Sequence, residues 1–484
     1  MKSFYIDDIT WNDLDMDEVI KRIDSSSSSV GSEYIRKALR NLLYDKEALS
    51  KRNSRSEYFK QNGKDAEALK KIFKSLGRVK KISFYDHIFR LKELERKSNA
   101  VHYILILALL CAIALIFIKP AFGIIAIVVM ISVNIILYFR QKARIEGYFI
   151  CFKYLVSMVK SAQAVLKKAD LNDECFDDIK EDLSGCVKAL KDLKRGAWLL
   201  TNSVSGSIVD VIMDYIRMIF HVDLIRFNQM QKKAIGHEEE IDSLYNALGE
   251  LELALSVCEY KEKLLYYCRP SFENAVSIGA EDIYHPLIKE PVPNSIDAKG
   301  SVLFTGSNAS GKSTFLKTLA IDQILAQSLG FALASSYKTT FFKVLSSMAL
   351  SDNILGNESY FVVEIKSLKR IFDELGADPV LCFIDEVLRG TNTKERIAAS
   401  SQILKKLTKE NALVFAATHD IELTEMLREN MTNLHFSETV NGNEVIFDYK
   451  IRKGPADSRN AIKLLEIYGF DSEIISEAIK MCLP

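Results

Sequence analysis

The chain lacks an excess of charge of either sign, because its 484 residues include 64 lysines and arginines and 64 aspartates and glutamates. Hydrophobic residues make up 48% of it and charged residues 26%. This balance excludes an intrinsically disordered chain, a collagen-like repeat and a uniformly basic nucleic-acid-binding protein. The length corresponds to roughly three domains.

The sequence also lacks the marks of a secreted or zinc-binding scaffold. Its eight cysteines are scattered without a C-x-x-C pair, and its seven histidines show no metal-ligand spacing. Scattered thiols favour a reducing compartment over a disulfide framework. Residues 1–18 are acidic and contain no apolar core, so we expect no cleavable signal peptide.

Residues 101–138 depart from the average composition because they carry almost no charge. Two uncharged runs, 101–118 and 121–138, flank Lys119-Pro120. As a helix each run would be about 27 Å long, close to the roughly 30 Å of a bilayer core. Proline breaks a helix, so Lys119-Pro120 indicates the tip of a transmembrane helical hairpin. A pair of fully buried core helices is the alternative.

The charges on both sides of the hairpin predict its orientation. Positive residues precede and follow the apolar runs, whereas the tip holds only Lys119. By the positive-inside rule both flanks lie in the cytoplasm. We therefore expect a cytoplasmic (inner) membrane protein with two crossing helices. The flanking residues are Lys92, Arg96, Lys97, Arg140, Lys142 and Arg144.

Residues 51–97 form a basic stretch, with 15 basic and six acidic residues and a local net charge of +9. Anionic lipid head groups and nucleic-acid phosphates are both candidate ligands. A solvated helix surface without a ligand explains the charge equally well.

The remaining residues up to 270 have the pattern of helices, because apolar residues recur three and four positions apart. The run Ser25–Ser29 is expected to be a short polar connector between helices. This region predicts helices that pack on helices, with nothing catalytic in it.

The first motif with a chemical role is a predicted phosphate-binding loop. The β-prone run Ser301–Thr305 leads into G-x-x-x-x-G-K-S at Gly306–Ser313, and a helix is expected over 314–328. Lys312 can reach the β and γ phosphates, and the Ser313 hydroxyl can ligate Mg²⁺. The candidate nucleotide-binding residues are Gly306, Ser307, Asn308, Ala309, Ser310, Gly311, Lys312, Ser313 and Thr314.

Two further apolar runs have the pattern of buried parallel strands. The first, Val380–Asp385, ends in a carboxylate that can hold Mg²⁺, and Glu386 can orient the attacking water or accept its proton. The second, Leu413–His419, would place His419 near the γ-phosphate, although an ordinary loop histidine is the alternative. These strands predict a parallel α/β sheet with its ligand at the carboxyl edge. Asn441-Gly442 predicts a β-hairpin beyond it.

From about His285 to Cys482 the chain resembles the MutS family. TGSNASGKSTF is similar to the phosphate loop of that family, LCFIDEVLRGTNT to its Mg²⁺-binding strand, and FAATHDIELTEM to its histidine strand. The resemblance implies an ABC-like P-loop ATPase domain that uses ATP and Mg²⁺, with Asp385 and Ser313 as metal ligands. No L-S-G-G-Q-like signature of a transporter ATPase is present.

The resemblance also implies a head-to-head homodimer with composite ATP sites. NESYFVVE is similar to the segment whose serine reaches across the dimer, so Ser359 would contact the γ-phosphate held by the partner's loop. A plain helix N-cap is the alternative for Ser359. Asn308 matches the asparagine of the family's G-P-N loop, but Ser307 replaces its proline. The family's aromatic residue for the base has no counterpart in residues 290–300, and Tyr284 lies farther back.

The front of the chain resembles the family's core and lever helices more weakly. There is no room for the N-terminal mismatch-reading domain, and the apolar hairpin takes the place of the DNA clamp. We therefore expect four regions. They are a helical core- or lever-like region at 1–97, the transmembrane hairpin at 98–140, a second helical region at 141–270, and the ATPase domain at 271–484.

The function expected from the sequence is that of a membrane-anchored MutS-like ATPase, whose nucleotide state drives the levers and membrane helices. Its expected partners are a second copy and the lipid bilayer, and no protein partner is identified. A membrane-tethered DNA-binding repair or recombination factor with DNA-stimulated ATPase activity is the alternative. Half of a transporter is a third reading, but two helices per chain are few and no intramembrane charge marks a pathway.

Overall fold

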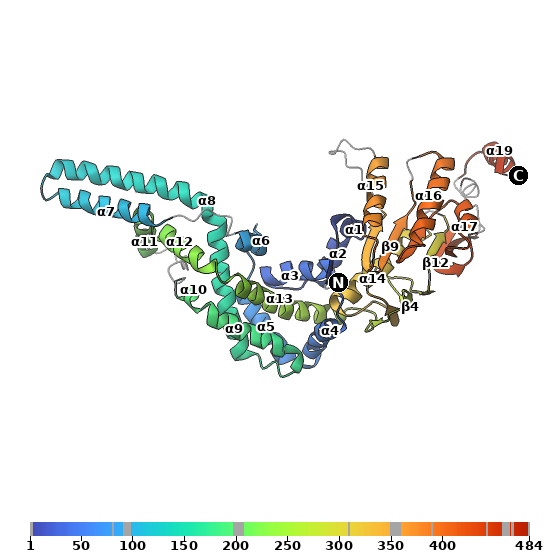
Figure 1. Ribbon diagram of the computed structural model, residues 1–484, viewed down its shortest axis with the longest axis horizontal. Helices are drawn as coiled ribbons and strands as arrows, with labels where there is room; N and C mark the ends of the chain where they lie inside the picture. The colour runs from blue at the N-terminus through green and yellow to red at the C-terminus, as the bar shows by residue number, and fades with distance from the viewer. Residues whose placement is uncertain are drawn as a thin grey trace. The chain divides into compact units, whose positions relative to one another are not determined.

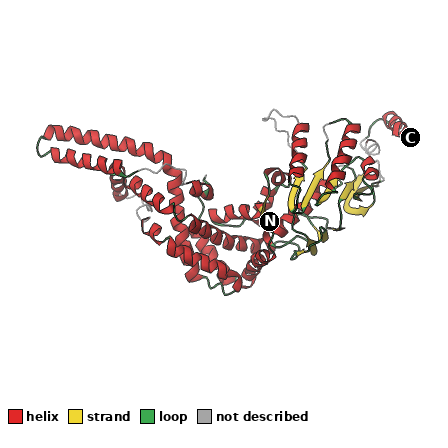
Figure 2. Ribbon diagram, viewed as in Figure 1, coloured by secondary structure: helices red, strands yellow, loops and turns green. Residues whose placement is uncertain are grey.

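The structure of the protein is a computed structural model (Figures 1 and 2). It describes residues 3–79, 82–90, 98–196, 208–307, 310–348, 360–388, 391–441, 444–456, 465 and 469–482. The chain divides into two compact units. The first comprises Met1–Ile23, Arg36–Asn53 and Glu259–Pro484, and the second comprises Asp24–Ile35 and Ser54–Cys258. The strands of the described residues all belong to the first unit, and the second is helical.

A six-stranded, mostly parallel sheet organises the first unit. Its order is β12-β11-β6-β10-β9-β8, and every neighbouring pair is parallel except β11 and β12, which form an antiparallel hairpin. This confirms the expected parallel-rich α/β sheet. Its strands are β6 (Val302–Thr305), β8 (Lys343–Ser347), β9 (Val380–Asp385), β10 (Ala412–Ala417), β11 (Thr432–Asn441) and β12 (Glu444–Lys453).

The central strands are apolar except for Thr305 and Asp385 at the carboxyl ends of β6 and β9, because they are buried on both faces. All residues of β6 and β9 are buried, and Ala417 of β10 pairs with Asp385 of β9. Helix α14 contacts β8, β9 and β10 and is buried over most of its surface, so its sequence is apolar on several faces. The helices of this part are α14 (Lys312–Leu329), α15 (Tyr360–Asp373), α16 (Thr393–Leu407), α17 (Glu422–Met426) and α19 (Ser472–Cys482).

The start of the chain covers the edge strand β8. In α1, the Thr10 hydroxyl accepts from the Ser346 N–H at 3.1 Å, and the Asp13 carboxylate accepts from the Ser346 hydroxyl at 2.6 Å and the Met348 N–H at 2.9 Å. These N-terminal segments thus belong to the unit of the sheet, whereas the sequence analysis grouped them with residues 1–97. They are β1 (Ser3–Tyr5), α1 (Asp8–Asp13), α2 (Met16–Ile23) and β2 (Asn41–Leu43).

A second, four-stranded sheet lies in the same unit, in the order β3-β7-β4-β5. Asn294 at the start of β5 binds β12, since its Nδ2 donates to the Tyr449 carbonyl at 2.9 Å and its Oδ1 accepts from the Ile451 N–H at 2.9 Å. These strands are β3 (Ser271–Phe272), β4 (Ile278–Ile283), β5 (Asn294–Ala298) and β7 (Ser336–Thr339).

Helix α8 (Pro120–Lys168) organises the second unit and contacts most of its other helices. Helices α3 (Ser29–Arg40), α4 (Lys46–Gln61) and α13 (Glu238–Lys261) each contribute residues to both units. The remaining elements are α5 (Gly63–Leu76), α6 (Phe84–Phe89), α7 (Ala100–Leu115), η2 (Glu174–Phe176), α9 (Asp177–Ala189), α10 (Lys191–Gly196), α11 (Ile208–Ile219) and α12 (Val222–Ala234).

The serine run has a structural role beyond that of a connector. The carboxylate of Glu252, which is buried in α13, accepts from the Ser27 N–H at 2.6 Å, the Ser28 N–H at 3.0 Å and the Ser28 hydroxyl. These donors offset the cost of burying a carboxylate. The connector is thereby bound to α13.

The expected hairpin is present as a pair of antiparallel helices (Figure 1). Helix α7 ends at Leu115 and α8 begins at Pro120, where the fixed φ of proline suits the first helical turn. Helix α8 does not end near Tyr138 as expected. It continues to Lys168, and its later part is stabilised by packing in the second unit, where Phe152, Leu155 and Val159 are buried.

The apolar side chains of the hairpin point outward. Phe117, between the two helices, is 88% exposed. In α8, only 17% of the most apolar segment of 18 residues is buried. The alternative of two buried core helices is therefore wrong for the chain by itself. Among the described residues, α8 alone is long and apolar enough to cross a membrane, and α7 is a shorter apolar helix.

Candidate functional site

The loop between β6 and α14 requires glycine at two positions. Gly306 and Gly311 have φ values of 140° and 109°. A Cβ at Gly306 would lie 2.5 Å from the Phe436 carbonyl oxygen, and one at Gly311 would lie 3.3 Å from Tyr449. Glycine removes both the strain and the contact. Asn308 and Ala309 lie outside the described residues.

Lys312 begins α14 and is 4% exposed. Its Nζ donates to the carbonyls of Gly306 at 2.7 Å and Ser307 at 2.8 Å, so the ammonium group lies against the loop that precedes it. The Ser310 hydroxyl is buried and has no hydrogen-bond partner within the described part of the chain. Leaving such a group unpaired costs about 1–3 kcal/mol, which a ligand oxygen would recover.

A cavity of about 470 Å³ opens beside this loop. Its lining includes polar side chains, among them Ser310, Lys312, Ser313 and Glu386. Its size is in the range of small-molecule sites. The lining also includes apolar and aromatic residues and a histidine, namely Ile283, Tyr284, His285, Ile288, Val292, Phe436 and Tyr449.

The aromatic residues come from parts of the chain that the sequence analysis did not connect with the loop. Tyr449 lies on β12, in the left-handed region with a φ of 55°, and Tyr284 follows β4. Only the sheet order brings β12 next to β11 and β11 next to β6. An aromatic residue on the second strand of the predicted hairpin was the one available signal.

His285 is a further lining residue that the sequence analysis missed as a site residue. It is 9% exposed, and its Nδ1 accepts from the Leu287 N–H at 3.2 Å. Burial, assisted by the charge of Lys317, lowers the pKa of His285 to about 4. The imidazole is therefore neutral at physiological pH.

The two neighbouring carboxylates, Asp385 and Glu386, lie in different environments. Asp385 ends β9 and is buried, whereas Glu386 reaches the cavity that Lys312 and Ser313 also line. Glu386 has a φ of 54°, and its N–H donates to the Ala417 carbonyl at 2.9 Å. Non-glycine residues in this backbone region cost about 1–3 kcal/mol and cluster at functional sites.

His419 lies beside this carboxylate, with its Nδ1 3.5 Å from Oε1 of Glu386. Its neighbour Asp420 accepts two hydrogen bonds from Arg396 of α16, at 2.9 and 2.6 Å. This bidentate pair fixes the segment that follows β10. Lys312, Ser313, Glu386 and His419 are thus brought to one edge of the sheet, while Ser359 lies outside the described residues.

Comparisons with known proteins agree with this geometry. The family model of MutS domain V matches residues 302–483. The DNA mismatch repair protein MutS of Lactobacillus delbrueckii subsp. bulgaricus is 30% identical over 268 residues, which are 53% of this chain and 31% of the relative. That of Leptospira interrogans is 28% identical over 285 residues, 56% of this chain and 33% of the relative.

A third relative has the same name and a similar extent of match. The DNA mismatch repair protein MutS of Thermus aquaticus is 28% identical over 257 residues, 52% of this chain and 31% of the relative. The chain thus spans about a third of the length of the curated relatives it matches. The match to MutS domain V includes the loop and the central strands of the site, so this part of the chain is similar to that domain.

Proposed function

We propose that this protein is a membrane-anchored ATPase that hydrolyses ATP at the Gly306–Ser313 loop. The observation that carries the proposal is that Lys312, Ser313 and Glu386 line one cavity together with the aromatic residues Tyr284, Phe436 and Tyr449. This combination suits a nucleotide, which has both charged phosphates and an aromatic base. The similarity of residues 302–483 to MutS domain V supports ATP and Mg²⁺ as the ligands.

The loop and the polar side chains beside it would bind the phosphates. Backbone N–H groups at the start of α14 and the ammonium of Lys312 favour anionic oxygens there. Ser313 and Asp385 are the proposed ligands of Mg²⁺, and the donor set fits, since this ion usually takes one or two carboxylates together with substrate phosphates. Bound Mg²⁺ would neutralise charge on the phosphates.

Glu386 is the proposed base for hydrolysis. It would orient a water molecule and accept its proton as the water oxygen bonds to the γ-phosphorus and the bond to ADP breaks. His419, 3.5 Å from Glu386, would contact the γ-phosphate by a hydrogen bond. Among the lining residues, Tyr449 and Tyr284 offer aromatic faces or edges for the base.

The active form proposed is a homodimer in which two first units face each other. Ser359 of one chain would complete the site of the other, as the family resemblance implies. Binding of ATP would favour the closed dimer, and hydrolysis would release it. The rearrangement would be passed to the helices around the membrane.

The hairpin of α7 and α8 is the proposed anchor. Apolar side chains on both helices are exposed, among them Ile104, Phe117, Phe122 and Ile125. A bilayer could cover these side chains without leaving backbone N–H and C=O groups unpaired, because a helix forms these hydrogen bonds internally. We propose the cytoplasmic membrane, with the ATPase unit in the cytoplasm.

A membrane-tethered DNA-binding repair or recombination factor is the second candidate. The relatives are DNA mismatch repair proteins, and one observation favours it. Lysines of α5 and α8 line a groove of about 670 Å³ in the second unit, namely Lys64, Lys71, Lys160 and Lys168. DNA that stimulates ATP hydrolysis, with binding that falls steeply with salt, would support this candidate.

Lys312→Ala tests the proposed activity. Removing the ammonium group should lower ATP turnover by about 100-fold or more, as the loss of a transition-state donor does. Turnover is measured on the full chain in lipid, with and without DNA. Lys338→Ala, an exposed lysine outside the cavity, is the matched control. Full turnover in Lys312→Ala would contradict the proposed site.

A further inference from the structure

Helix α11 exposes apolar side chains on several of its faces. Residues 211–216 are all exposed, and because they cover more than one turn they include every face of the helix. Five of the six are apolar. They are Val211 at 54%, Ile212 at 54%, Met213 at 38%, Tyr215 at 55% and Ile216 at 39% exposure. Clusters of this kind mark interaction sites.

The end of α11 is fixed to both helices of the hairpin. The Asn134 Nδ2 of α8 donates to the Ile219 carbonyl at 3.1 Å, and the His221 Nε2 lies 2.9 Å from the Asn134 carbonyl oxygen. The His221 Nδ1 lies 2.9 Å from Nδ1 of His102, near the start of α7. All three of these side chains are buried. They hold α11 at the foot of the hairpin, away from its tip.

The depth of this attachment follows from helix geometry. Asn134 precedes Tyr138, the last residue of the apolar run, by about one turn or 6 Å. Amphipathic helices at membrane surfaces lie about 5–10 Å into the boundary between head groups and acyl chains. A hairpin inserted up to Tyr138 would therefore bring the end of α11 to this depth.

The polar residues of α11 have the arrangement that such a helix needs. Asp214 and Arg217 form an ion pair at 3.1 Å. Residues three apart share one side of a helix, so this pair lies on one side of α11. Head groups can solvate the exposed Asp214 carboxylate there, while acyl chains cover the apolar side chains.

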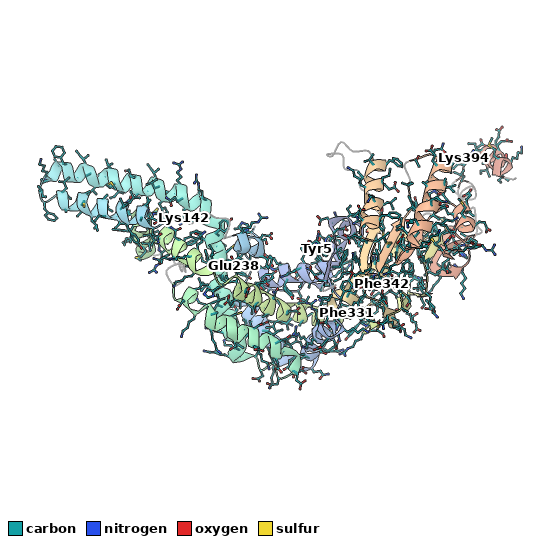
Figure 3. All side chains as sticks on the ribbon, viewed as in Figure 1. Tyr5, Lys142, Glu238, Phe331, Phe342 and Lys394 are labelled. Carbon is teal, nitrogen blue, oxygen red and sulfur yellow. The ribbon has the colours of Figure 1, made fainter. Side chains whose placement is uncertain are left out.

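Positive charge follows the hairpin immediately. Arg140 and Arg144 of α8 are exposed, and Lys142, labelled in Figure 3, donates to the Tyr138 hydroxyl at 2.7 Å. Basic residues beside a membrane helix attract anionic lipid phosphates. The foot of the hairpin thus has both an apolar helix and a positive border.

We propose that α11 is a third membrane contact, which lies in the head-group boundary of an anionic phospholipid leaflet at the foot of the hairpin. This inference rests on the proposed membrane anchoring. Lipid is favoured over a second copy of the chain because a protein would cover one face, whereas α11 exposes several. The hairpin itself also exposes apolar side chains near its foot, at Tyr103, Ile104 and Phe139.

Photo-cross-linking from single positions tests the contact. The full chain carries Tyr215→p-benzoylphenylalanine and is reconstituted into vesicles of phosphatidylethanolamine and phosphatidylglycerol, then irradiated and analysed by mass spectrometry and denaturing gel. Phe122 in the hairpin, 66% exposed, is the positive control, and the exposed Lys188 of α9 is the negative control. All three positions are on the surface, so the replacements leave the core intact.

The proposal predicts lipid adducts at positions 122 and 215 and none at 188. An adduct at 122 without one at 215 would overturn the role of α11 and leave the anchoring intact. A cross-linked dimer from position 215 would show that a second copy covers α11, and would overturn the lipid contact. No adduct at either 122 or 215 would contradict the anchoring and the inference with it.

Discussion

Lys312 and His285 are two buried residues that line the same cavity, and their nitrogen atoms have opposite roles in hydrogen bonds. Lys312 donates to two loop carbonyls, and a nucleotide phosphate would offer it the same kind of acceptor. His285 instead accepts a backbone N–H at Nδ1, which requires that nitrogen to be unprotonated. Protonation of His285 would therefore break a contact beside the candidate site.

This difference predicts how stability depends on pH. The pKa of His285 is about 4 in the folded chain, and the value for an unfolded chain is about 6.5. Between these values the unfolded chain binds more protons, so stability is lost as pH falls from 6.5 toward 4, by about 3 kcal/mol at most. His285→Asn keeps an acceptor but removes this titration.

The test compares thermal unfolding of wild type and His285→Asn over this pH range, without nucleotide. The wild-type midpoint should fall more steeply. Parallel profiles would show that His285 is not responsible.

At the level of elements, α14 lies between two glycines with left-handed backbone. Gly311 precedes it in the phosphate loop, and Gly330 ends it with a φ of 75°. A Cβ at Gly330 would lie 2.6 Å from the Leu49 carbonyl oxygen, in the N-terminal segment that belongs to the same unit. Helix α14 thus ends at Gly330, where its backbone lies against Leu49 of α4.

Gly330→Ala should destabilise the first unit by about 1–3 kcal/mol, because alanine is strained in this backbone region and its methyl group meets a carbonyl. The measurement is the shift of the thermal unfolding midpoint. Gly376→Ala is the control, since no atom lies within 4 Å of the added Cβ there. Equal shifts in the two variants would argue against a special role for Gly330.

At the level of the whole molecule, the proposed dimer should depend on bound ATP. Glutamine at position 386 keeps the size of the side chain but cannot accept a proton, so ATP would bind and persist. Glu386→Gln should therefore have the mass of two chains with ATP and Mg²⁺, and of one without.

Light scattering in detergent measures this mass. Glu386→Gln combined with Lys312→Ala serves as control, because it should not hold the nucleotide. A single chain in the presence of ATP, with nucleotide binding demonstrated, would rule out dimerisation driven by ATP.

Much of the site could be predicted from the sequence because its parts are local. Gly306–Ser313 carries its own strand-loop-helix context, and the carboxylate and histidine that follow β9 and β10 meet at one edge because parallel strands end together. The hairpin was also predicted, since uncharged runs of this length leave few other conformations. The chemistry in each case depends on residues close in the chain.

Other features depend on contacts between distant residues. Tyr449 and Tyr284 reach the cavity only through the order of strands and the hydrogen bonds of Asn294. The serine run is fixed by hydrogen bonds to Glu252 of α13, and the hydrogen bond from Asn134 to the Ile219 carbonyl attaches the end of α11 to the hairpin. A pattern of apolar spacing states which face of a helix is buried, but not which element covers it.

The sequence by itself thus determined the phosphate loop, the acidic strand end, the mostly parallel sheet and the apolar hairpin, because each is encoded in a short run of residues. Only the tertiary structure decided that Tyr449 of β12 and Tyr284 after β4 line the cavity, that the start of the chain covers β8, and that α8 continues far beyond its apolar part. These outcomes depend on packing between residues far apart in the chain, where many pairings share the same local pattern and the buried contacts select one.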